Sequence, residues 1–273
     1  MIDAEEYFIS KMKNSDIGDD GAVVDEFIYS VDAFCEGSHF KREWMNYSEI
    51  ATKAMLINIS DAIAMNAKPL YALISIVLPK DITTKEIDEL SKAFLSVAKN
   101  YNFRIIGGDT VGGDKLDISI TIISKSDNPL LRSTINRSDI LAYTGVLGES
   151  KRDLNKLFKG ETIDKNSKFI KPILRDKFIY SSREYLTAGM DISDGLFCDT
   201  NKILDINSFG FELIKKIDID IGSSGEEYEM LIAFNPKNLD KILQIAKNIN
   251  LKITPFAKVI DGNNRMICKS HHF

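Results

Sequence analysis

Residues 46–78 read NYSEIATKAMLINISDAIAMNAKPLYALISIVL and combine two patterns of apolar side chains. Over residues 46–67 the apolar positions recur at helical spacing, and Pro69 closes the segment, which predicts a helix. Residues 70–78 are rich in β-branched side chains and have about half the length of a membrane span, so they predict a buried strand. Asp61 falls well inside this apolar helix, where a carboxylate is unusual and suggests a specific role.

Helices and strands alternate along the rest of the chain. Thr83 and Glu86 form a capping-box pattern, which predicts a second helix that runs to about residue 100. Further strands are predicted at 104–106, 116–124, 140–144, 228–234 and 252–259, and a strand end is predicted between Met190 and Ile192. Further helices are predicted at 177–186, 195–207 and 238–250, and a lysine-rich segment of weak periodicity lies at 154–170. This alternation predicts an α/β (α+β) fold in which mixed sheets are layered with helices.

The chain is expected to form two domains. The polar segment 126–139 contains Asp127, Asn128 and Pro129 and is the best candidate for a linker. We therefore place the domains at 1–126 and 127–273.

The composition is that of an ordinary folded protein. Its 44% hydrophobic and 27% charged residues exclude a disordered or collagen-like chain. Lys and Arg number 35 against 40 Asp and Glu, which gives a net charge of −5, so no overall positive field would hold a nucleic acid. We expect small-molecule partners, and neither nucleic acid nor membrane.

The amino terminus and the cysteines indicate a cytoplasmic protein. Residues 1–12 carry acidic side chains where an export signal needs basic ones. Cys35, Cys198 and Cys268 are odd in number and widely spaced, which fits neither a disulfide framework nor a metal clip. We therefore expect three reduced thiols.

Acidic residues beside glycines recur along the whole chain, whereas Walker A, GxGxxG and GxSxG sequences are absent from it. The acidic motifs are GDDGAVV at 18–24, SVDAFCEGSHF at 30–40, NISDAIAM at 58–65, GGDT at 107–110 and GMDISDGL at 189–196. Any one of them alone is equally well explained as a solvated turn or a helix N-cap. Their recurrence is what indicates a shared site.

The residue types of these motifs select the kind of metal. A calcium loop starting at Asp16 would have Phe27 where the bidentate acid belongs, so an EF-hand is excluded. His39 is followed by no other histidine before His271 and His272, so a histidine zinc site or a Ser-His-Asp triad has little support. Aspartates without Cys or His select hard cations, of which Mg²⁺ is the usual one where phosphates complete the coordination.

Electrostatics points to the same chemistry. At an effective dielectric of about 20, two like charges about 5 Å apart repel by roughly 3 kcal/mol. A cluster of six aspartates therefore needs divalent cations, and a bound triphosphate would need several of them. The expected reaction is metal-dependent phosphoryl transfer.

Taken together and in order, the motifs resemble the thiamine-monophosphate kinase family. The segments that carry the resemblance are GDDGAVV, SVDxxxEGSHF, NISDAIAMNAKP, IIGGDT, MDISDGL and SGEEYEML, within about residues 18–231. The resemblance implies two mixed α/β domains of the aminoimidazole-ribonucleotide synthetase-like type and a homodimer formed through the amino-terminal domain.

The resemblance also implies a reaction. ATP would phosphorylate thiamine monophosphate directly, giving ADP and thiamine diphosphate without a phosphoenzyme. A phosphate monoester has a second pKa of about 6, so the nucleophile is largely ionised at neutral pH and no general base is expected. Positioning and metal charge should suffice.

Site residues follow from the resemblance, motif by motif. Magnesium ligands are expected at Asp20, Ser30, Asp32, Asp61, Asp109, Asp191 and Asp194, with Asp19 as a weaker candidate. ATP contacts are expected at Gly108, Asp109, Arg132 and Ser193, and thiamine phosphate contacts at His39 and Glu226. The alternatives are another ATP-dependent synthetase of the same superfamily and a non-catalytic nucleotide-binding relative.

Overall fold

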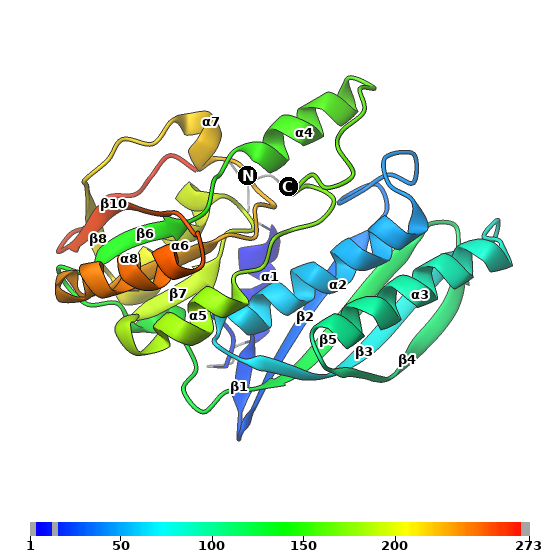
Figure 1. The fold of residues 1–273 in the computed structure, drawn as a ribbon, viewed down its shortest axis with the longest axis horizontal. Coiled ribbons are helices and arrows are strands. Elements are labelled where there is room, and N and C mark those ends of the chain that lie inside the picture. Colours follow the sequence, from blue (N-terminus) through cyan, green and yellow to red (C-terminus); the bar gives the residue numbers. More distant parts are fainter. Residues whose placement is uncertain (1–3, 13–15, 269–273) are drawn as a thin grey trace.

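The computed structural model describes residues 4–12 and 16–268, and its strands form two five-stranded sheets layered with helices (Figure 1). The first sheet has the order β1-β2-β5-β3-β4 and the second the order β7-β9-β6-β10-β8. Within the described residues the sheets draw on separate parts of the chain, since the first uses residues 22–125 and the second residues 140–260. The predicted α/β fold of mixed sheets and helices is confirmed.

The first sheet is covered by helices on one face only (Figure 1). Its strands are β1 (Ala22–Val24), β2 (Phe27–Cys35), β3 (Lys68–Pro79), β4 (Arg104–Gly113) and β5 (Asp117–Lys125), and only β3 and β4 run parallel. Helices α2 (Tyr47–Ala64) and α3 (Thr84–Asn100) cover the inner face. On the outer face Val31 lies in one cross-strand row with Leu73, and both are exposed.

The second sheet is antiparallel throughout and has helices on both faces. Its strands are β6 (Ile140–Thr144), β7 (Ala188–Asp191), β8 (Gly210–Leu213), β9 (Met230–Phe234) and β10 (Ile253–Ile260). Helices α5 (Asp176–Ser182) and α8 (Leu239–Asn248) share one apolar core with α2, and α6 (Leu196–Asn207) packs on the other side. The remaining helices are α1 (Ala4–Met12), α4 (Glu149–Phe158) and α7 (Ile219–Gly222), with short 3₁₀ turns at Arg132–Thr134, Arg183–Tyr185 and Pro236–Asn238.

Helix α2 is the central element of the molecule. A capping box between Asn46 and Glu49 starts it, which satisfies backbone N–H groups that would otherwise lack partners. Nearly every residue from its second turn onward is buried, and it contacts strands of both sheets. The helix and strand predicted from residues 46–78 are confirmed, and so is the capping box of Thr83 and Glu86 at α3.

Several elements differ from the sequence expectations. Strand β4 continues through the GGDT motif to Gly113 instead of ending at residue 106. The lysine-rich segment overlaps α4, an amphipathic helix that begins at Glu149. Strands β1, β2 and β8 were not predicted, because they are short or alternate too weakly for the pattern to be distinctive.

The expectation of three reduced thiols is wrong for two of them. Cys198 on α6 and Cys268 form a disulfide, with their Cα atoms 5.0 Å apart. The two residues are 70 positions apart in the sequence, and only the fold brings them together. Cys35 is a free thiol.

None of the helices in the described part of the chain is long and apolar enough to cross a membrane.

Candidate functional site

A cleft of about 810 Å³ opens where β2, α2, the β7–α6 connection and the loop before β9 meet. Predicted site residues from all of these elements line it. They are Asp19, Asp20, Asp32, His39, Asp61, Arg132, Asp191, Ser193, Asp194 and Glu226. Residues from four of the five acidic motifs that are scattered along the sequence therefore meet in one place.

Three of these aspartates bring their carboxylates together. Asp20 precedes β1, Asp61 lies in the last turns of α2, and Asp191 ends β7. One carboxylate oxygen from each lies within 4.8 Å of the others. An arrangement of this kind can coordinate a divalent cation.

Two buried side-chain oxygen atoms of the predicted metal ligands have no hydrogen-bond partner in the described part of the chain. Asp20 Oδ2 and Ser30 Oγ have no hydrogen bond to any residue that the structure describes. A buried polar atom without a partner costs free energy, which a bound ligand would recover. Because all the candidate metal-ligand atoms here are oxygen atoms, the site fits a hard divalent cation.

Burial and, to a smaller extent, neighbouring charges raise the pKa values of Asp61, Asp191 and Asp32. Burial raises the pKa of Asp61 and of Asp191 well above the ordinary value, and neighbouring aspartates add to both shifts. Burial, followed by the charges of Asp20 and Asp194, raises the pKa of Asp32 to about 6. The cluster therefore favours bound protons or a cation over bare negative charge.

Arg132 is the cation that faces this cluster. Its guanidinium Nη2 pairs with Asp20 Oδ1, and its backbone N–H donates to Asp19 Oδ1. Burial alone would lower the pKa of Arg132, but the carboxylates of Asp20, Asp191 and Asp199 together outweigh it and the pKa is raised. The predicted ATP-contact residue thus lies in the cleft, paired with a predicted metal ligand.

The turn between β7 and α6 is held by a second group of charges. Lys202 Nζ pairs with Asp194 and lies 3.2 Å from Asp199 Oδ1. The Asp194 backbone N–H donates to Asp199 Oδ2 at 3.1 Å, and the Ser193 carbonyl accepts from the Glu226 backbone N–H at 2.7 Å. Asp194 is therefore in the cleft, but its carboxylate is engaged by a lysine.

The two predicted substrate residues lie in the same cleft. His39 Nδ1 accepts a hydrogen bond from the Cys35 backbone N–H at 3.0 Å. Glu226 has 21% of its side chain exposed and accepts a hydrogen bond from Lys53 at 2.8 Å. Of the other histidines, His271 and His272 lie outside the described residues.

Gly108 and Asp109 are not brought to the cleft, because both lie within β4. A Cβ at Gly108 would come 1.7 Å from the carbonyl oxygen of Ile74 on β3, so only glycine permits this strand to approach. The prediction that a strand ends just before Asp109 is wrong, since β4 continues beyond it.

Asp109 lies on the uncovered outer face of the first sheet. It pairs with Ser75, and the row continues through Ser119 to Ala33, so two strands separate it from β2. Asp32, next to Ala33 on β2, points to the opposite, inner face because neighbouring strand residues alternate. Asp109 is exposed and accepts a hydrogen bond from the Thr110 backbone N–H.

Several residues at the site were not predicted from the sequence. Lys53 and Ser60 lie on α2, as Asp61 does, and these two share one side of the helix because they are seven positions, about two turns, apart. Both are polar residues inside an apolar helix, as Asp61 is, and that signal was available for all three. Lys202 and Asp199 carried no comparable signal, because a charged pair three positions apart on a helix is common and its contact with Asp194 in the β7–α6 turn depends on the fold.

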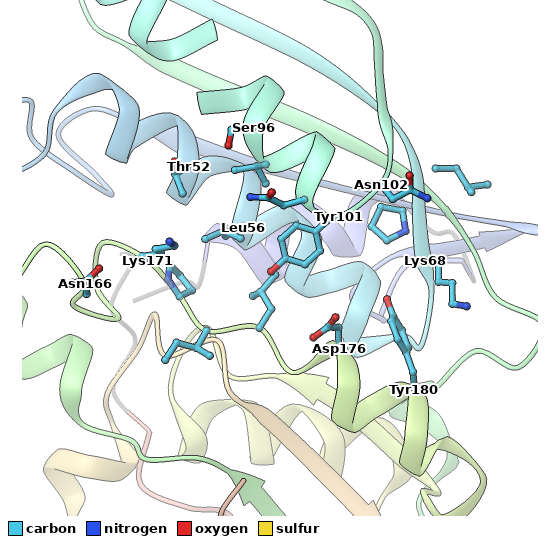
Figure 2. Close-up of a pocket in the computed structure, with 17 residues that line it drawn as sticks. Thr52, Leu56, Lys68, Ser96, Tyr101, Asn102, Asn166, Lys171, Asp176 and Tyr180 are labelled. Carbon is cyan, nitrogen blue, oxygen red and sulfur yellow. The ribbon is translucent and has the colours of Figure 1, made fainter. Parts of the chain in front are cut away.

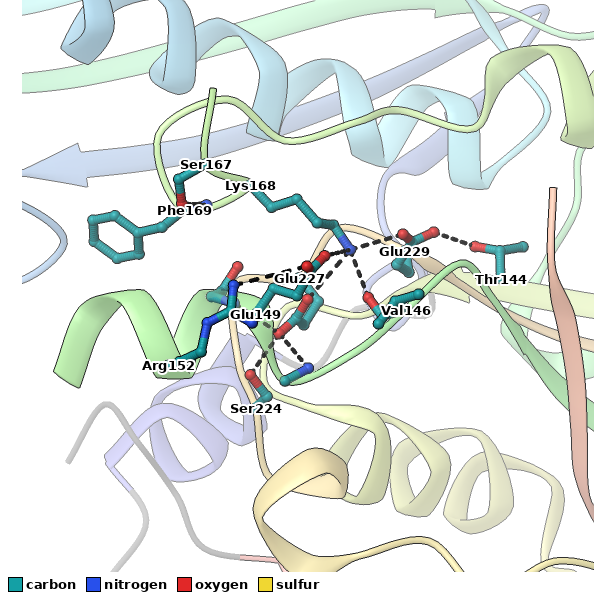
Figure 3. A network of polar contacts seen from close by, with 12 residues as sticks. Thr144, Val146, Glu149, Arg152, Ser167, Lys168, Phe169, Ser224, Glu227 and Glu229 are labelled. Atoms are coloured by element: carbon teal, nitrogen blue, oxygen red, sulfur yellow. Dashed lines mark hydrogen bonds and ion pairs between the residues drawn. The ribbon is translucent and has the colours of Figure 1, made fainter. Parts of the chain in front are cut away.

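The loop that carries Glu226 is anchored by a buried network (Figure 3). Glu227 accepts hydrogen bonds from the backbone N–H groups of Gly148 and Ser150. Lys168 Nζ lies 2.8 Å from Glu229 Oε1 and 3.4 Å from Glu227 Oε2, and Figure 3 shows it between these two carboxylates. The network fixes both sides of Tyr228, which itself lines the cleft.

A second cavity of about 910 Å³ lies away from the acidic cluster (Figure 2). It separates α2 and α3 from the segment that leads into α5, and the rings of Tyr101 and Tyr180 line it. Burial raises the pKa of Tyr101 to about 12, with a contribution from Asp176. None of the predicted site residues lines this cavity.

Known proteins resemble the chain over most of its length. Residues 18–125 match a family model described as AIR synthase related protein, N-terminal domain. A thiamine-monophosphate kinase of Buchnera aphidicola subsp. Schizaphis graminum (strain Sg) is 33% identical over 268 residues, covering 87% of this chain and 82% of that protein. One of Buchnera aphidicola subsp. Acyrthosiphon pisum (strain APS) is 31% identical over 296 residues, covering 94% and 91%.

A solved structure described as AaThiL complexed with AMPPCP and TMP shares the fold. It matches with a TM-score of 0.87 and 23% sequence identity, covering 98% of this chain and 96% of that one.

Proposed function

The chain belongs to the thiamine-monophosphate kinase family, and we propose on this basis that it transfers the γ-phosphoryl group of ATP to thiamine monophosphate. The products are ADP and thiamine diphosphate. The observation that carries the proposal is the convergence of Asp20, Asp61 and Asp191, whose carboxylate oxygens lie within 4.8 Å of one another beside a cleft.

These carboxylates are proposed to bind Mg²⁺. Bound Mg²⁺ supplies positive charge that offsets the phosphates of ATP and the phosphoryl group in transfer. Asp20, Asp61 and Asp191 form the core of this site, and Ser30, Asp32 and Asp194 are further candidate ligands within or beside the same cleft. The partnerless Asp20 Oδ2 and Ser30 Oγ support this assignment.

Arg132 and Ser193 are proposed to contact ATP. Arg132 is paired with Asp20, and a cation on that carboxylate would compete for the same oxygen atoms. The guanidinium would then be available to a phosphate, for which its planar fork is well suited. Ser193 lies in the turn that leads into α6, whose first backbone N–H groups favour an anion.

His39 and Glu226 are proposed to contact thiamine monophosphate. Both line the cleft, and their backbones belong to different halves of the chain. The acceptor phosphate is largely ionised at neutral pH and needs no general base. The work of the protein is then to hold the acceptor in line with ATP, which by itself lowers the barrier substantially.

We further propose that the chain acts as a homodimer through the outer face of its first sheet. Tyr29, Val31, Leu73 and Val111 are exposed apolar residues of this sheet, and burying them against a second copy would be favourable. Asp109 lies on the same face. In such a dimer it would come close to the partner subunit, whereas it does not reach the cleft of its own chain.

The domain boundary is proposed near residue 126, between the strands of the two sheets. The reaction is proposed to take place in the cytoplasm, where ATP is made and consumed.

A coupled assay of ADP release tests the proposed reaction. We expect ADP release that requires both Mg²⁺ and thiamine monophosphate and that is absent with unphosphorylated thiamine. A different superfamily synthetase would release ADP only with another substrate. A non-catalytic relative would bind ATP tightly in calorimetry and would release no ADP with or without thiamine monophosphate.

A further inference from the structure

Lys53 is a charged side chain buried in the middle of helix α2. Its side chain is 0% exposed, and its Nζ donates a hydrogen bond to Glu226 Oε2 at 2.8 Å. Burying an ammonium group is costly unless a partner compensates its charge. This pairing joins the helix of the first half of the chain to the loop before β9 in the second half.

Two aromatic rings complete the surroundings of Lys53. Its Nζ lies 3.8 Å from the ring centroid of Phe169 and 5.5 Å from that of Phe34. Ring faces attract a cation and also exclude water from it. Because the ammonium group is shielded from solvent, its ion pair with Glu226 is stronger and its geometry is more fixed than on a surface.

The backbone of Glu226 is held by hydrogen bonds, whereas the direction of its side chain depends on the contacts of its carboxylate. Its φ of +54° is in the left-handed region, its N–H donates to the Ser193 carbonyl, and its own carbonyl accepts from Ser150 Oγ at 2.8 Å. The carboxylate lies partly exposed in the cleft. Because Lys53 binds Oε2, it sets where Oε1 is presented to a ligand.

We propose that Lys53 is a positioning residue for the phosphoryl acceptor, acting through the Glu226 carboxylate. This inference rests on the proposed function. A carboxylate oxygen accepts hydrogen bonds and pairs with cations, and thiamine monophosphate offers an amino group and a cationic ring. Lys53 does not touch the acceptor itself, but it orients the Glu226 carboxylate, which does.

The test compares Michaelis constants for the two substrates. For Lys53→Met we expect the KM for thiamine monophosphate to rise about tenfold or more. The KM for ATP should change less than about twofold, because Lys53 is not bonded to the residues proposed for ATP. The matched control is Lys80→Met, which removes an exposed lysine paired with Asp114 and should leave both constants unchanged.

A double-variant cycle separates positioning from general damage. Glu226→Gln should raise the KM for thiamine monophosphate by a similar factor, and adding Lys53→Met to it should bring little further loss. If Lys53→Met does not fold, Lys53→Arg measured with and without Glu226→Gln carries the same comparison. An unchanged KM, an equal rise in both KM values, or multiplicative effects of the two substitutions would overturn the proposal.

Failure of the reaction itself gives a different result. If the wild-type protein shows no ADP release that depends on thiamine monophosphate, the proposed function is refuted before any variant is compared. If the wild type is active and Lys53→Met matches it, only the positioning role is refuted.

Discussion

Ser60 donates a hydrogen bond to Asp191 Oδ2 across 2.6 Å, which joins helix α2 to the carboxyl end of β7. Both residues are buried. The bond favours the charged form of Asp191, against the burial that raises its pKa. Since Asp61 is the next residue on α2, this contact fixes the separation between two of the three carboxylates that converge in the cleft.

Replacing Asp61 with asparagine should abolish most of the turnover without unfolding the protein. The substitution keeps the shape of the side chain and removes one charged ligand from the cluster, so kcat should fall at least about a hundredfold. The assay of ADP release at saturating substrates measures it, and circular dichroism with a thermal melt checks the fold. Asp88→Asn on the exposed side of α3 is the control. A rate near that of the wild type would contradict the metal assignment.

Replacing Asp199 with asparagine should make the stability of the metal-free protein less dependent on pH. Burial raises the pKa of Asp199 to about 7, Lys202 opposes the shift and Asp194 adds to it. The ordinary value is 3.8, so the folded state holds this proton more tightly than the unfolded state. The stability that Asp199 contributes is full below about pH 4 and is lost as the pH rises through about 7.

The measurement is urea unfolding with a chelator at several pH values. The free energy of unfolding of Asp199→Asn, relative to the wild type, should increase with pH by up to about 1.4 kcal/mol per unit between about pH 4 and 7 and then level off. Asp205→Asn on the same helix, where the aspartate is exposed, is the control. A difference that stays constant over this range would show that Asp199 is not protonated in the folded state.

Two inactive variants should restore each other's activity when their subunits are mixed. Asp109→Asn and Asp32→Asn each remove a proposed ligand, but Asp109 lies on the face proposed to meet a partner. If Asp109 serves the partner's cleft, a mixed dimer holds one intact site, and equal mixing should recover about a quarter of the wild-type activity. Sedimentation confirms the dimer. No recovery after verified subunit exchange would show that Asp109 does not act in the partner's cleft.

Cys268→Ser should destabilise the oxidised protein. The disulfide to Cys198 closes a long loop and ties the segment after β10 to α6. Its loss should lower the free energy of unfolding by about 2–4 kcal/mol. A reducing agent should do the same to the wild type and nothing further to the variant. Cys35→Ser, which removes the free thiol, is the control, and equal stability of oxidised and reduced wild type would argue against the bond.

The sequence predicted those features that depend on local patterns. The helices α2 and α3 have capping boxes and regular apolar spacing, so their starts were predictable. The meeting of Asp20, Asp61 and Asp191 was predictable because acidic motifs recur along the chain and because these motifs resemble those of one family.

Features that depend on the register of strands or on distant contacts were not predictable. The position of Asp109 depends on how closely β4 approaches β3 at Gly108, which a local pattern does not reveal. The pairing of Cys198 with Cys268 and that of Lys53 with Glu226 join residues far apart in the sequence. In each case the residue type was visible in the sequence, but its contact partner was not.

The buried face of α2 has a consequence for which acceptors the cleft admits. Lys53 and Asp61 are eight residues apart on α2, and a rise of about 1.5 Å per residue sets them about 12 Å apart along the helix axis. Helix α2 thus holds the lysine that binds Glu226 and one carboxylate of the acidic cluster at a constant separation. We therefore expect a phosphate ester that is too short to extend from the Glu226 carboxylate to the cluster to be a poorer acceptor.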